Sequence, residues 1–329
     1  MKLSILDQAP ISVGKTPRDA LVASLNLAQT AEKLGYVRYW IAEHHDFPAL
    51  ACPAPEVMLS YIGAQTSKIR IGSGAVLLPH YKPFKIAETY NLLATLFPGR
   101  IDLGIGRAPG GSAEATMALS DNYLEGVKKI PEATKELVQF LRNHFPSDHM
   151  YSKVSASPLP AIAPVPWILG TSEKSAILAA ENGTPYAFGH FMSEKDGASI
   201  IKKYEENFQA NEKLEQPQSI LCVSAICADT TEKAEELALS NALWKIQLNN
   251  GKGRAGIPSI EEARQYSFIQ DEKNKLSRKT IIGNPKEVKE ELLTLQTQYK
   301  VNEMMIVTIT HRYEDRARSY ELIAEAFSN

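Results

Sequence analysis

The stretch PGRIDLGIGRAPGG, residues 98–111, joins an apolar strand-like run to a loop rich in glycine. Similar runs of Val, Ile, Leu and aromatic residues recur along the chain, and each is short enough for a buried strand. Together they predict eight strands, near residues 2–7, 37–42, 69–78, 100–106, 166–170, 185–190, 218–228 and 303–309. The first four begin about 31 to 35 residues apart, the usual length of one βα repeat. This spacing predicts strands that alternate with helices.

Amphipathic segments lie between these strands, and several have recognisable ends. Thr16-Pro17-Arg18-Asp19 offers an N-cap, a proline at the first helical position and an acid three residues after the cap. Asn284-Pro285-Lys286-Glu287 repeats this pattern, and the last helix is expected over 313–327. Because strands and helices alternate, we expect a parallel sheet with helical crossovers.

Two intervals between strands are longer than the others. After the fourth strand we expect one helix near 121–142 and an extra loop. After the seventh we expect two helices and a polar stretch, 249–279, as a candidate lid. Since the strand pattern resumes after each insertion, we predict one α/β domain over residues 1–329, a (β/α)8 TIM barrel with insertions after strands 4 and 7. A doubly wound sheet with a second, smaller domain is the alternative.

The composition is that of an ordinary globular protein, with 44% hydrophobic and 22% charged residues. The 36 Lys and Arg residues against 38 Asp and Glu leave a net charge of -2, so there is no global attraction to nucleic acid or to an anionic membrane. No uncharged apolar run is long enough to span a bilayer. The cysteines, Cys52, Cys222 and Cys227, form no CxxC pair, and we expect them to be reduced in a cytoplasmic protein.

The second strand ends in Glu43-His44-His45, at the position where a barrel carries its catalytic loops. Adjacent strand residues point to opposite faces, and no HxH or HExxH spacing is present, so the pattern argues against a metal site. An imidazole at this position can transfer protons near neutral pH. The alternative is a polar strand end with one structural histidine.

Small and anion-binding residues gather in strands three to five. Gly72-Ser73-Gly74-Ala75 would make room for a flat ligand, or simply a narrow barrel layer. Arg107 suits phosphate, with a salt bridge at the barrel rim as the alternative. Gly170-Thr171-Ser172-Glu173-Lys174-Ser175 brings hydroxyls and free amides to a helix start, where phosphates bind, although Ser172 also suits a plain N-cap. Because these strands are neighbours, Arg107 and this turn are predicted to form one phosphate pocket.

With DQAPI, WIAEHH, GSGAVLLP, GIGRAPG and LGTSEKSA in this order, the chain resembles the flavin-dependent luciferase-like monooxygenases, especially the single-chain members. The likeness extends from Leu3 to the terminal SYELIAEAF. The resemblance implies a (β/α)8 barrel, usually dimeric, that binds FMN at the carboxyl ends of the strands. It implies catalytic positions at His44 and His45, with His44 as general base or hydrogen-bond partner beside the flavin.

The resemblance also implies how this chain would hold FMN. Gly74-Ala75 would form a non-prolyl cis peptide beneath the ring, and Ala9 and His190 would approach the ring. The phosphate would lie against four residues: Arg107, Thr171, Ser172 and Ser175. Gly106 stands where light-emitting luciferases have a reactive thiol, so bioluminescence is not expected.

These inferences lead to the hypothesis of an FMN-dependent monooxygenase. Reduced FMN from a separate flavin reductase would react with O2 to give a C4a-hydroperoxide, which oxygenates a small organic substrate such as an aldehyde or an organosulfur compound. Two alternatives stay open: hydride transfer with the deazaflavin F420, and a flavin-binding protein without turnover. We expect a homodimer.

Overall fold

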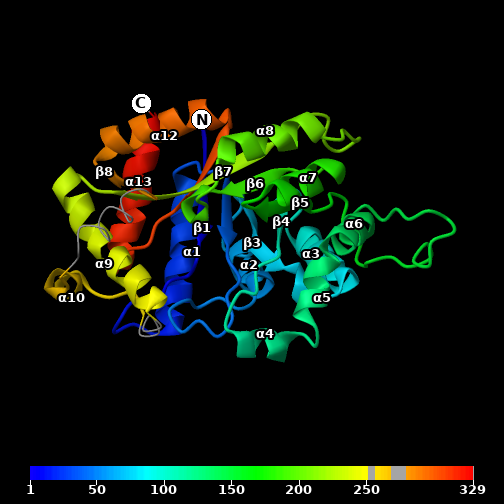
Figure 1. Cartoon of the computed structure of the whole chain (residues 1–329), viewed down its shortest axis with the longest axis horizontal. Coiled ribbons are helices and arrows are strands. Elements are labelled where there is room, and N and C mark those ends of the chain that lie inside the picture. Colours follow the sequence, from blue (N-terminus) through cyan, green and yellow to red (C-terminus); the bar gives the residue numbers. More distant parts are fainter. Residues whose placement is uncertain (251–255, 268–278, 329) are drawn as a thin grey trace.

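The computed structural model describes residues 1–250, 256–267 and 279–328, and its parallel strands close into a barrel (Figure 1). Closure follows because β1 pairs with both β2 and β9, and β6 pairs with both β5 and β7. The barrel strands are β1 (Lys2–Asp7), β2 (Arg38–Ile41), β3 (Arg70–Leu77), β4 (Ile101–Gly106), β5 (Val165–Gly170), β6 (Tyr186–Gly189), β7 (Ser219–Cys227) and β9 (Glu303–Val307). The predicted (β/α)8 barrel is confirmed, and a doubly wound open sheet is excluded.

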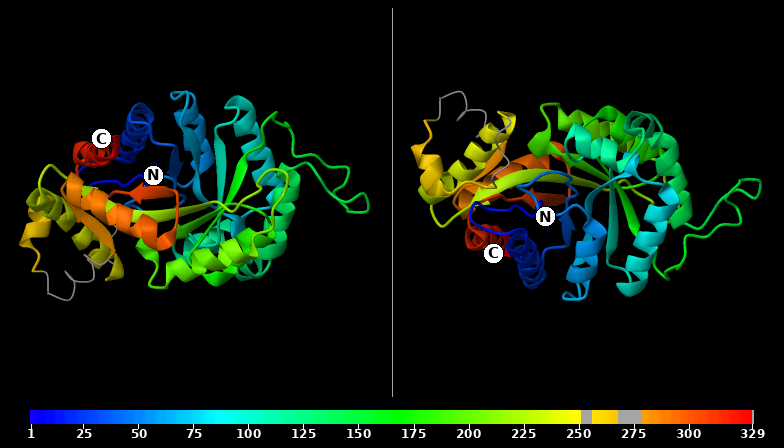
Figure 2. Two further views of the ribbon diagram at one scale, coloured as in Figure 1. Left: turned by 90° about the horizontal axis from the view of Figure 1, so that it is seen from above. Right: turned by 90° about the horizontal axis from the view of Figure 1, so that it is seen from below.

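Helices form a layer around the barrel (Figure 2). They are α1 (Pro17–Lys33), α2 (Pro55–Gly63), α3 (Pro83–Leu96), α4 (Ala113–Leu119), α5 (Tyr123–Lys128), α6 (Ile130–Leu141), α7 (Glu173–Glu181), α8 (Gly197–Asn207), α9 (Thr231–Asn249), α10 (Ile260–Gln265), α12 (Pro285–Tyr299) and α13 (Tyr313–Ser328). Two 3₁₀ turns, η1 (Leu78–His80) and η2 (His190–Met192), follow β3 and β6. The capping boxes at Thr16 and Asn284 form as predicted, so the sequence marked both helix starts correctly.

The insertion after β4 differs from the prediction of one helix near 121–142. It contains three helices, α4, α5 and α6, and the break between α5 and α6 falls just before Pro131. Proline has no amide hydrogen and clashes with the preceding turn, so it begins α6 instead of continuing α5. The loop over 142–164 then projects from the side of the molecule (Figure 1).

The insertion after β7 contains α9, α10 and a strand that the sequence analysis missed, β8 (Thr280–Gly283). β8 pairs with β7 from Ser224 to Cys227 and adds an edge outside the closed ring. Four residues beside a polar stretch carry too little pattern to mark a strand. The candidate lid, 249–279, falls largely on 251–255 and 268–278, which lie outside the described residues.

Side chains on the strands alternate between two cores. Trp40 and Trp167 belong to the core inside the barrel, where their rings meet edge to face with centroids 5.4 Å apart. Tyr39 and Ile168 belong to the core between the strands and the helices. Because both faces of the strands are covered, the strand sequences read as nearly continuous apolar runs.

A buried ion cluster fills the amino end of the barrel. Arg38 lies 2.7 Å from Asp102 and 2.6 Å from Glu303, while Arg70 Nε donates to Asp102 at 3.0 Å and Ser4 donates to Glu303 at 2.5 Å. Burial alone would lower the pKa of Arg38, but the two carboxylates outweigh it and raise this pKa. The charges at this end are therefore paired with one another, and the opposite end remains for a ligand.

Candidate functional site

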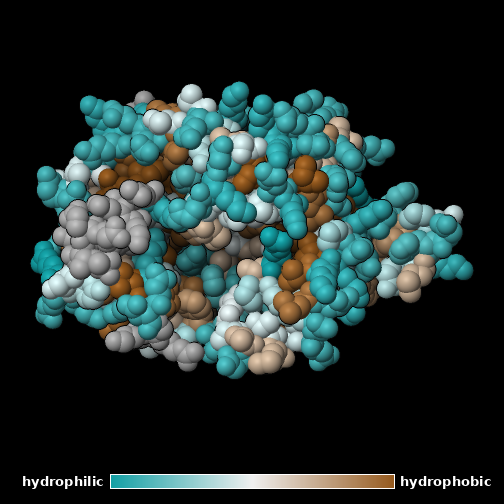
Figure 3. Space-filling view, in the orientation of Figure 1, coloured by the Kyte–Doolittle hydropathy of each residue, from teal (hydrophilic) through white to brown (hydrophobic). Residues whose placement is uncertain are grey.

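The carboxyl ends of the strands surround a cavity of about 350 Å³, the central pocket. This volume is near the lower end of the range for small-molecule sites. Figure 3 shows the surface hollowed near the centre of the view, with hydrophobic side chains at the edge of the hollow. The lining of the central pocket comes from strand ends and the loops after them: Leu6, Gln8, Ala42, Glu43, His44, Gly74, Ala75, Leu77, Gly106, Arg107, Ala108, Gly110, Leu169, Gly170, Thr171, Ala187, Gly189, Phe191, Met192 and Cys222.

His44 lies in the wall of the central pocket. Its Nδ1 atom is buried and has no hydrogen-bond partner among the described residues, and its ring lies 5.9 Å from that of Phe47. Burial, followed by the nearby His45, lowers the pKa of His44 to about 4. Burial therefore favours the neutral imidazole at pH 7.

Glu43 organises the wall beside His44. Its carboxylate is bonded to His45 Nε2 at 2.7 Å and accepts hydrogen bonds from Tyr81 Oη at 2.7 Å and from the Leu77 amide at 3.2 Å. Burial and then the charge of Glu43 raise the pKa of Tyr81 above its usual range. His45 is thus held outside the lining of the central pocket, and the two histidines occupy different environments.

Small residues on β3 and β4 form one side of the central pocket. The Gly74–Ala75 peptide is cis, as the resemblance implies. A Cβ atom on Gly74 would lie 2.5 Å from Leu6 Cδ1, and one on Gly106 would lie 3.0 Å from Ala75 Cβ. A side chain at Gly74 would have to displace the end of Leu6, and one at Gly106 would press on Ala75, so glycine leaves the most room on this side of the pocket for a flat group.

Arg107 lies at the rim, where it lines the central pocket and two neighbouring cavities of about 680 and 340 Å³. Its backbone carbonyl accepts a hydrogen bond from Tyr123 Oη at 2.7 Å. Its exposed guanidinium makes no ion pair or hydrogen bond with any residue that the structure describes. The rim salt bridge that the sequence left open is therefore not seen in this part of the chain, and a planar cation is available to an anion.

The turn at the start of α7 is a well-formed helix cap. Ser172 Oγ accepts from the Ser175 amide at 3.3 Å, and Ser175 Oγ donates to the Ser172 carbonyl at 2.7 Å. Ser175 Oγ also lies 3.0 Å from Tyr186 Oη. The N-cap interpretation of Ser172 is therefore confirmed. With the hydroxyls engaged in this way, the amides of the first turn are the groups most open to an anion.

Arg107 and this turn line the same cavities, and the phosphate pocket that the sequence suggests there stays a prediction. Arg107 and Thr171 both line the central pocket. Arg107 lines the 680 Å³ cavity with Ser172 and Lys174, and the 340 Å³ cavity with Ser175. One guanidinium and one helix N-terminus, far apart in the sequence, thus face the same space.

Ala9 lies next to the central pocket and is not part of its lining. It is fully buried with φ at 49°, and its amide donates to Asp7 Oδ1 at 2.7 Å. The neighbouring Gln8 lines the pocket instead. No pattern in the sequence marked Gln8, because the turn after β1 decides which of these residues faces inward.

His190 is likewise outside the lining, since its Nδ1 atom is bonded to Tyr299 Oη at 3.0 Å. Burial, followed by the charge of Lys279, lowers the pKa of His190. The next two residues, Phe191 and Met192, line the central pocket. His190 was expected to approach the flavin ring, but the structure brings its neighbours Phe191 and Met192 into the pocket lining instead.

Cys222 also lines the central pocket and was expected only to be reduced. Burial raises its pKa to about 12, so the thiol is protonated and unreactive at neutral pH. The alternation of side chains along β7 could have identified this position. The adjacent Leu221 packs in the outer core, so Cys222 points into the barrel. Among the described residues, no group of three or more His, Cys, Asp or Glu side chains is placed to hold a metal ion.

The family model of the luciferase-like monooxygenases matches residues 1–299. The chain belongs to the luciferase-like monooxygenase family. It is 37% identical to an N-acetyl-S-alkylcysteine monooxygenase of Bacillus subtilis, over 99% of this chain and 98% of that protein. Within the described residues, no helix is long and apolar enough to cross a membrane.

Two solved structures of other proteins have the same fold. The crystal structure of apo-MsnO8 superposes with a TM-score of 0.88 at 34% identity, covering 99% of this chain and 98% of that one. The oxygenating constituent of 3,6-diketocamphane monooxygenase from Pseudomonas putida, solved in complex with FMN, has a TM-score of 0.72 at 20% identity and covers 99% and 97% of the two chains. At that identity the second likeness supports the fold alone.

Proposed function

We propose that this luciferase-like protein is an FMN-dependent monooxygenase that uses reduced FMN and O2, through the C4a-hydroperoxide of the flavin, to oxygenate a small organic substrate. The observation that carries the proposal is the convergence of Arg107 and the α7 turn beside an open pocket wall next to His44. A free planar cation and first-turn amides suit a phosphate, and an open wall suits a ring.

The residues present fit FMN. Arg107 and the first turn of α7 would hold the phosphate. The cis peptide between Gly74 and Ala75, with Gly106 beside it, would support the ring. When bound, the reduced flavin would supply the electrons that activate O2.

His44 would hold a hydrogen bond or a proton beside the ring. Its lowered pKa keeps it neutral at pH 7, so it can accept a proton from a neighbouring group. An anionic group near the ring would raise this pKa again, because opposite charge favours the protonated imidazole. His45, bonded to Glu43, would act as a positioning residue behind this wall.

The walls of the central pocket would exclude water from the reacting atoms. Leu6, Leu169, Phe191 and Met192 are apolar side chains in this lining. An apolar enclosure limits side reactions of a reactive oxygen species with water. The relative that oxygenates N-acetyl-S-alkylcysteines makes small S-alkyl compounds the first substrates to test.

We also propose a cytoplasmic homodimer that receives reduced FMN from a separate flavin reductase. Large apolar side chains on neighbouring helices support the dimer: Val57 and Tyr61 on α2 are 65% and 47% exposed, and Leu92 and Leu96 on α3 are 49% and 57% exposed. Exposed apolar side chains gathered in this way are typical of a protein interface. Sedimentation of the protein with Leu96→Glu, which places a charge in this face, tests the dimer.

Anaerobic titration with reduced FMN, followed by rapid mixing with O2, tests the proposed function. We expect saturable binding and a transient flavin absorbance that decays faster when an S-alkyl substrate is present. The same titration with F420 serves as a comparison. Tighter binding of F420 than of FMN, or no saturable binding of reduced FMN, would overturn the proposal. Binding of reduced FMN without any transient flavin absorbance, together with the same rate of flavin reoxidation in His44→Ala as in the natural protein, would support a passive flavin carrier.

A further inference from the structure

The described lining of the central pocket contains two sulfur-bearing side chains, Met192 and Cys222. Cys222 is buried, and burial raises its pKa to about 12, so the reactive thiolate does not form at neutral pH. Met192 is 61% exposed at the end of η2, and a thioether reacts with oxidants without losing a proton. Met192 is therefore the oxidisable sulfur in this lining.

The thioether of Met192 packs over the end of β6. A Cβ atom on Gly189 would lie 3.2 Å from Met192 Cγ, 3.4 Å from Met192 Sδ and 3.3 Å from Thr171 Cγ2. Gly189 and Thr171 both line the central pocket. The Ser193 amide donates to the His190 carbonyl at 3.1 Å and closes the turn that carries Met192. The sulfur thus lies at the edge of the central pocket, although the side chain as a whole is exposed.

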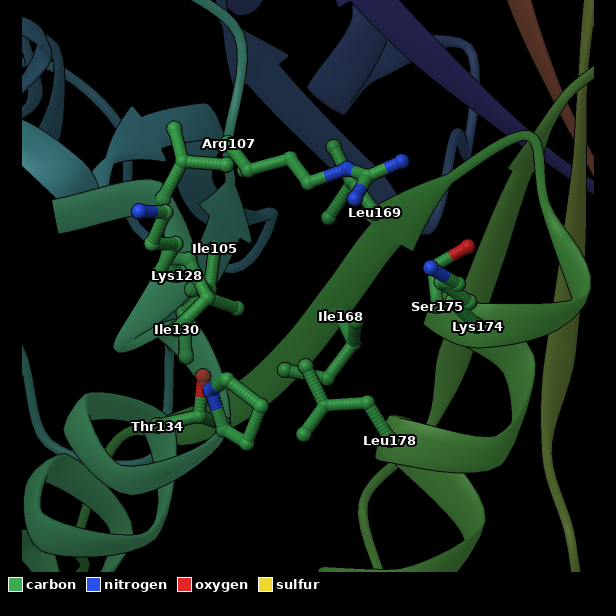
Figure 4. Close-up of a pocket in the computed structure, with 13 residues that line it drawn as sticks. Ile105, Arg107, Lys128, Ile130, Thr134, Ile168, Leu169, Lys174, Ser175 and Leu178 are labelled. Atoms are coloured by element: carbon green, nitrogen blue, oxygen red, sulfur yellow. The ribbon is translucent and has the colours of Figure 1, made fainter. Parts of the chain in front are cut away.

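The two cavities beside the central pocket have no sulfur in the linings that the structure describes. Figure 4 shows Ile105, Ile168 and Leu178 around the 340 Å³ cavity, whose lining is otherwise aliphatic, polar or basic. The 680 Å³ cavity is lined by polar and charged side chains and by Ile200. Of these three spaces, a thioether lines the central pocket alone, so an oxidant held there has a sulfur within the wall around it.

We propose that Met192 is a modification site, oxidised to methionine sulfoxide by a hydroperoxide in the central pocket when no substrate is present to take the oxygen. The proposal rests on the proposed function, which places an oxygenation in this pocket. The sulfur lone pair attacks the outer oxygen of the hydroperoxide, so an S–O bond forms and the O–O bond breaks. The proton of the outer oxygen passes to the inner one, which leaves as an alcohol or as water. Sulfur loses two electrons and the hydroperoxide gains them.

The sulfoxide changes the wall of the central pocket. Oxidation converts a flexible apolar side chain into a polar one. A sulfoxide oxygen at the end of β6 attracts water to a wall whose other members include Leu6, Leu169 and Phe191. Water in the pocket favours side reactions of the oxidant over oxygenation of a substrate. Turnover without substrate therefore slows the protein's own reaction until a methionine sulfoxide reductase restores the thioether.

Two other exposed methionines serve as internal controls. Met117 and Met150 lie outside the lining of the central pocket and are 69% and 79% exposed, more than Met192. The natural protein is loaded with reduced FMN without air, mixed with O2 in the presence of catalase, and digested for mass spectrometry. We expect at least about fivefold more sulfoxide at Met192 than at either control, because an oxidant held in the pocket reaches the nearest sulfur first. Added hydrogen peroxide without flavin should follow exposure instead, with Met150 oxidised fastest.

The outcomes separate this proposal from the proposed function. An S-alkyl substrate should lower the oxidation of Met192 at least about fivefold, because oxygenation of the substrate prevents the side reaction. Equal oxidation of the three methionines during a transient flavin absorbance would overturn this proposal alone, as would sulfur oxidation at Cys222 in place of Met192. Absence of the transient would overturn the proposed function and this proposal with it.

Met192→Leu and Met150→Leu are a matched pair, since each replaces a thioether by a hydrocarbon side chain of similar volume. After turnover without substrate, Met150→Leu and the natural protein should lose at least about half of their own starting rates, and methionine sulfoxide reductase should restore them. Met192→Leu should keep its own starting rate. The same loss in Met192→Leu would contradict the proposed effect of the sulfoxide. If Met192→Leu fails to bind FMN, mass spectrometry of the natural protein decides the outcome.

Discussion

The two ends of the barrel handle charge in opposite ways. At the amino end Arg38, Asp102 and Glu303 are buried and paired with one another. At the carboxyl end the guanidinium of Arg107 and the Nδ1 atom of His44 lack partners among the described residues. The charges at the amino end therefore contribute to stability, whereas those at the carboxyl end are available to bind a ligand. Removing a paired buried charge leaves its partners uncompensated, whereas removing a free charge costs only what a ligand would gain from it.

The largest expected effect comes from the paired arginine. Arg38→Met should lower the free energy of unfolding by about 3 to 5 kcal/mol, because two buried carboxylates lose a partner. Arg107→Met should change it by no more than about 0.5 kcal/mol, because nothing described depends on that guanidinium. Urea unfolding of both variants measures this contrast. Equal stability losses would break the comparison between the two ends.

The second effect is a loss of stability in acid that depends on His44. Burial lowers the pKa of His44 from 6.5 to about 4. Between pH 6.5 and pH 4 the unfolded chain therefore binds a proton at His44 that the folded protein does not bind. The contribution of His44 to the free energy of unfolding is fully present above about pH 6.5 and is lost as the pH falls toward 4. At pH 5 the loss is about 2 kcal/mol.

Urea unfolding of the natural protein and His44→Asn, each at pH 7.5 and at pH 5, measures this term. The variant should lose less stability between the two pH values by that amount. The same pH dependence in both proteins would show that His44 is already solvated in the folded state.

A smaller effect separates two helix caps. Ser172→Ala at α7 and Thr230→Ala at α9 should each cost about 1 kcal/mol, because each hydroxyl accepts a backbone amide near its helix start. Only Ser172→Ala should also weaken FMN binding, because Ser172 lines a cavity with Arg107. Thermal unfolding and flavin fluorescence give the two readouts. Weaker FMN binding in Thr230→Ala would place the phosphate elsewhere.

The smallest effect concerns an exposed ion pair. Lys203 lies 2.5 Å from Glu173 on the surface, and both side chains are largely solvated. Lys203→Gln should change stability by less than about 0.5 kcal/mol, because water screens such pairs. A loss as large as that of Arg38→Met in chemical unfolding would show that burial does not explain the importance of the amino-end cluster.

Much of the barrel was predictable because its signals are local. The eight barrel strands, the caps at Thr16 and Asn284, and the closeness of Arg107 to the α7 turn follow from apolar runs, capping patterns and strand order. No short sequence pattern determines which way a side chain points in a loop. Ala9 and His190 lie one residue away from side chains that line the pocket, because the backbone turn decides which neighbour faces inward.

Other features depended on contacts that no short pattern records. The four-residue strand β8 and the 340 Å³ cavity beside the central pocket arise from packing between distant segments, whereas the break between α5 and α6 follows from Pro131, a local signal that the prediction of one helix ignored. The pairing of Arg38 with Glu303 joins residues at opposite ends of the chain. The alternation of side chains along β2 and β9 can place Arg38 and Glu303 inside the barrel, but only closure of the ring brings them together.

The phosphate grip of Arg107 is tested most directly by comparing FMN with riboflavin, which has the same ring without the phosphate. Reduced forms of both are titrated anaerobically into the natural protein and into Arg107→Met. We expect the natural protein to prefer FMN by at least about tenfold, since a charge-assisted contact contributes about 1.5 to 3 kcal/mol, and Arg107→Met to lose most of this preference. An unchanged preference in Arg107→Met would contradict the account.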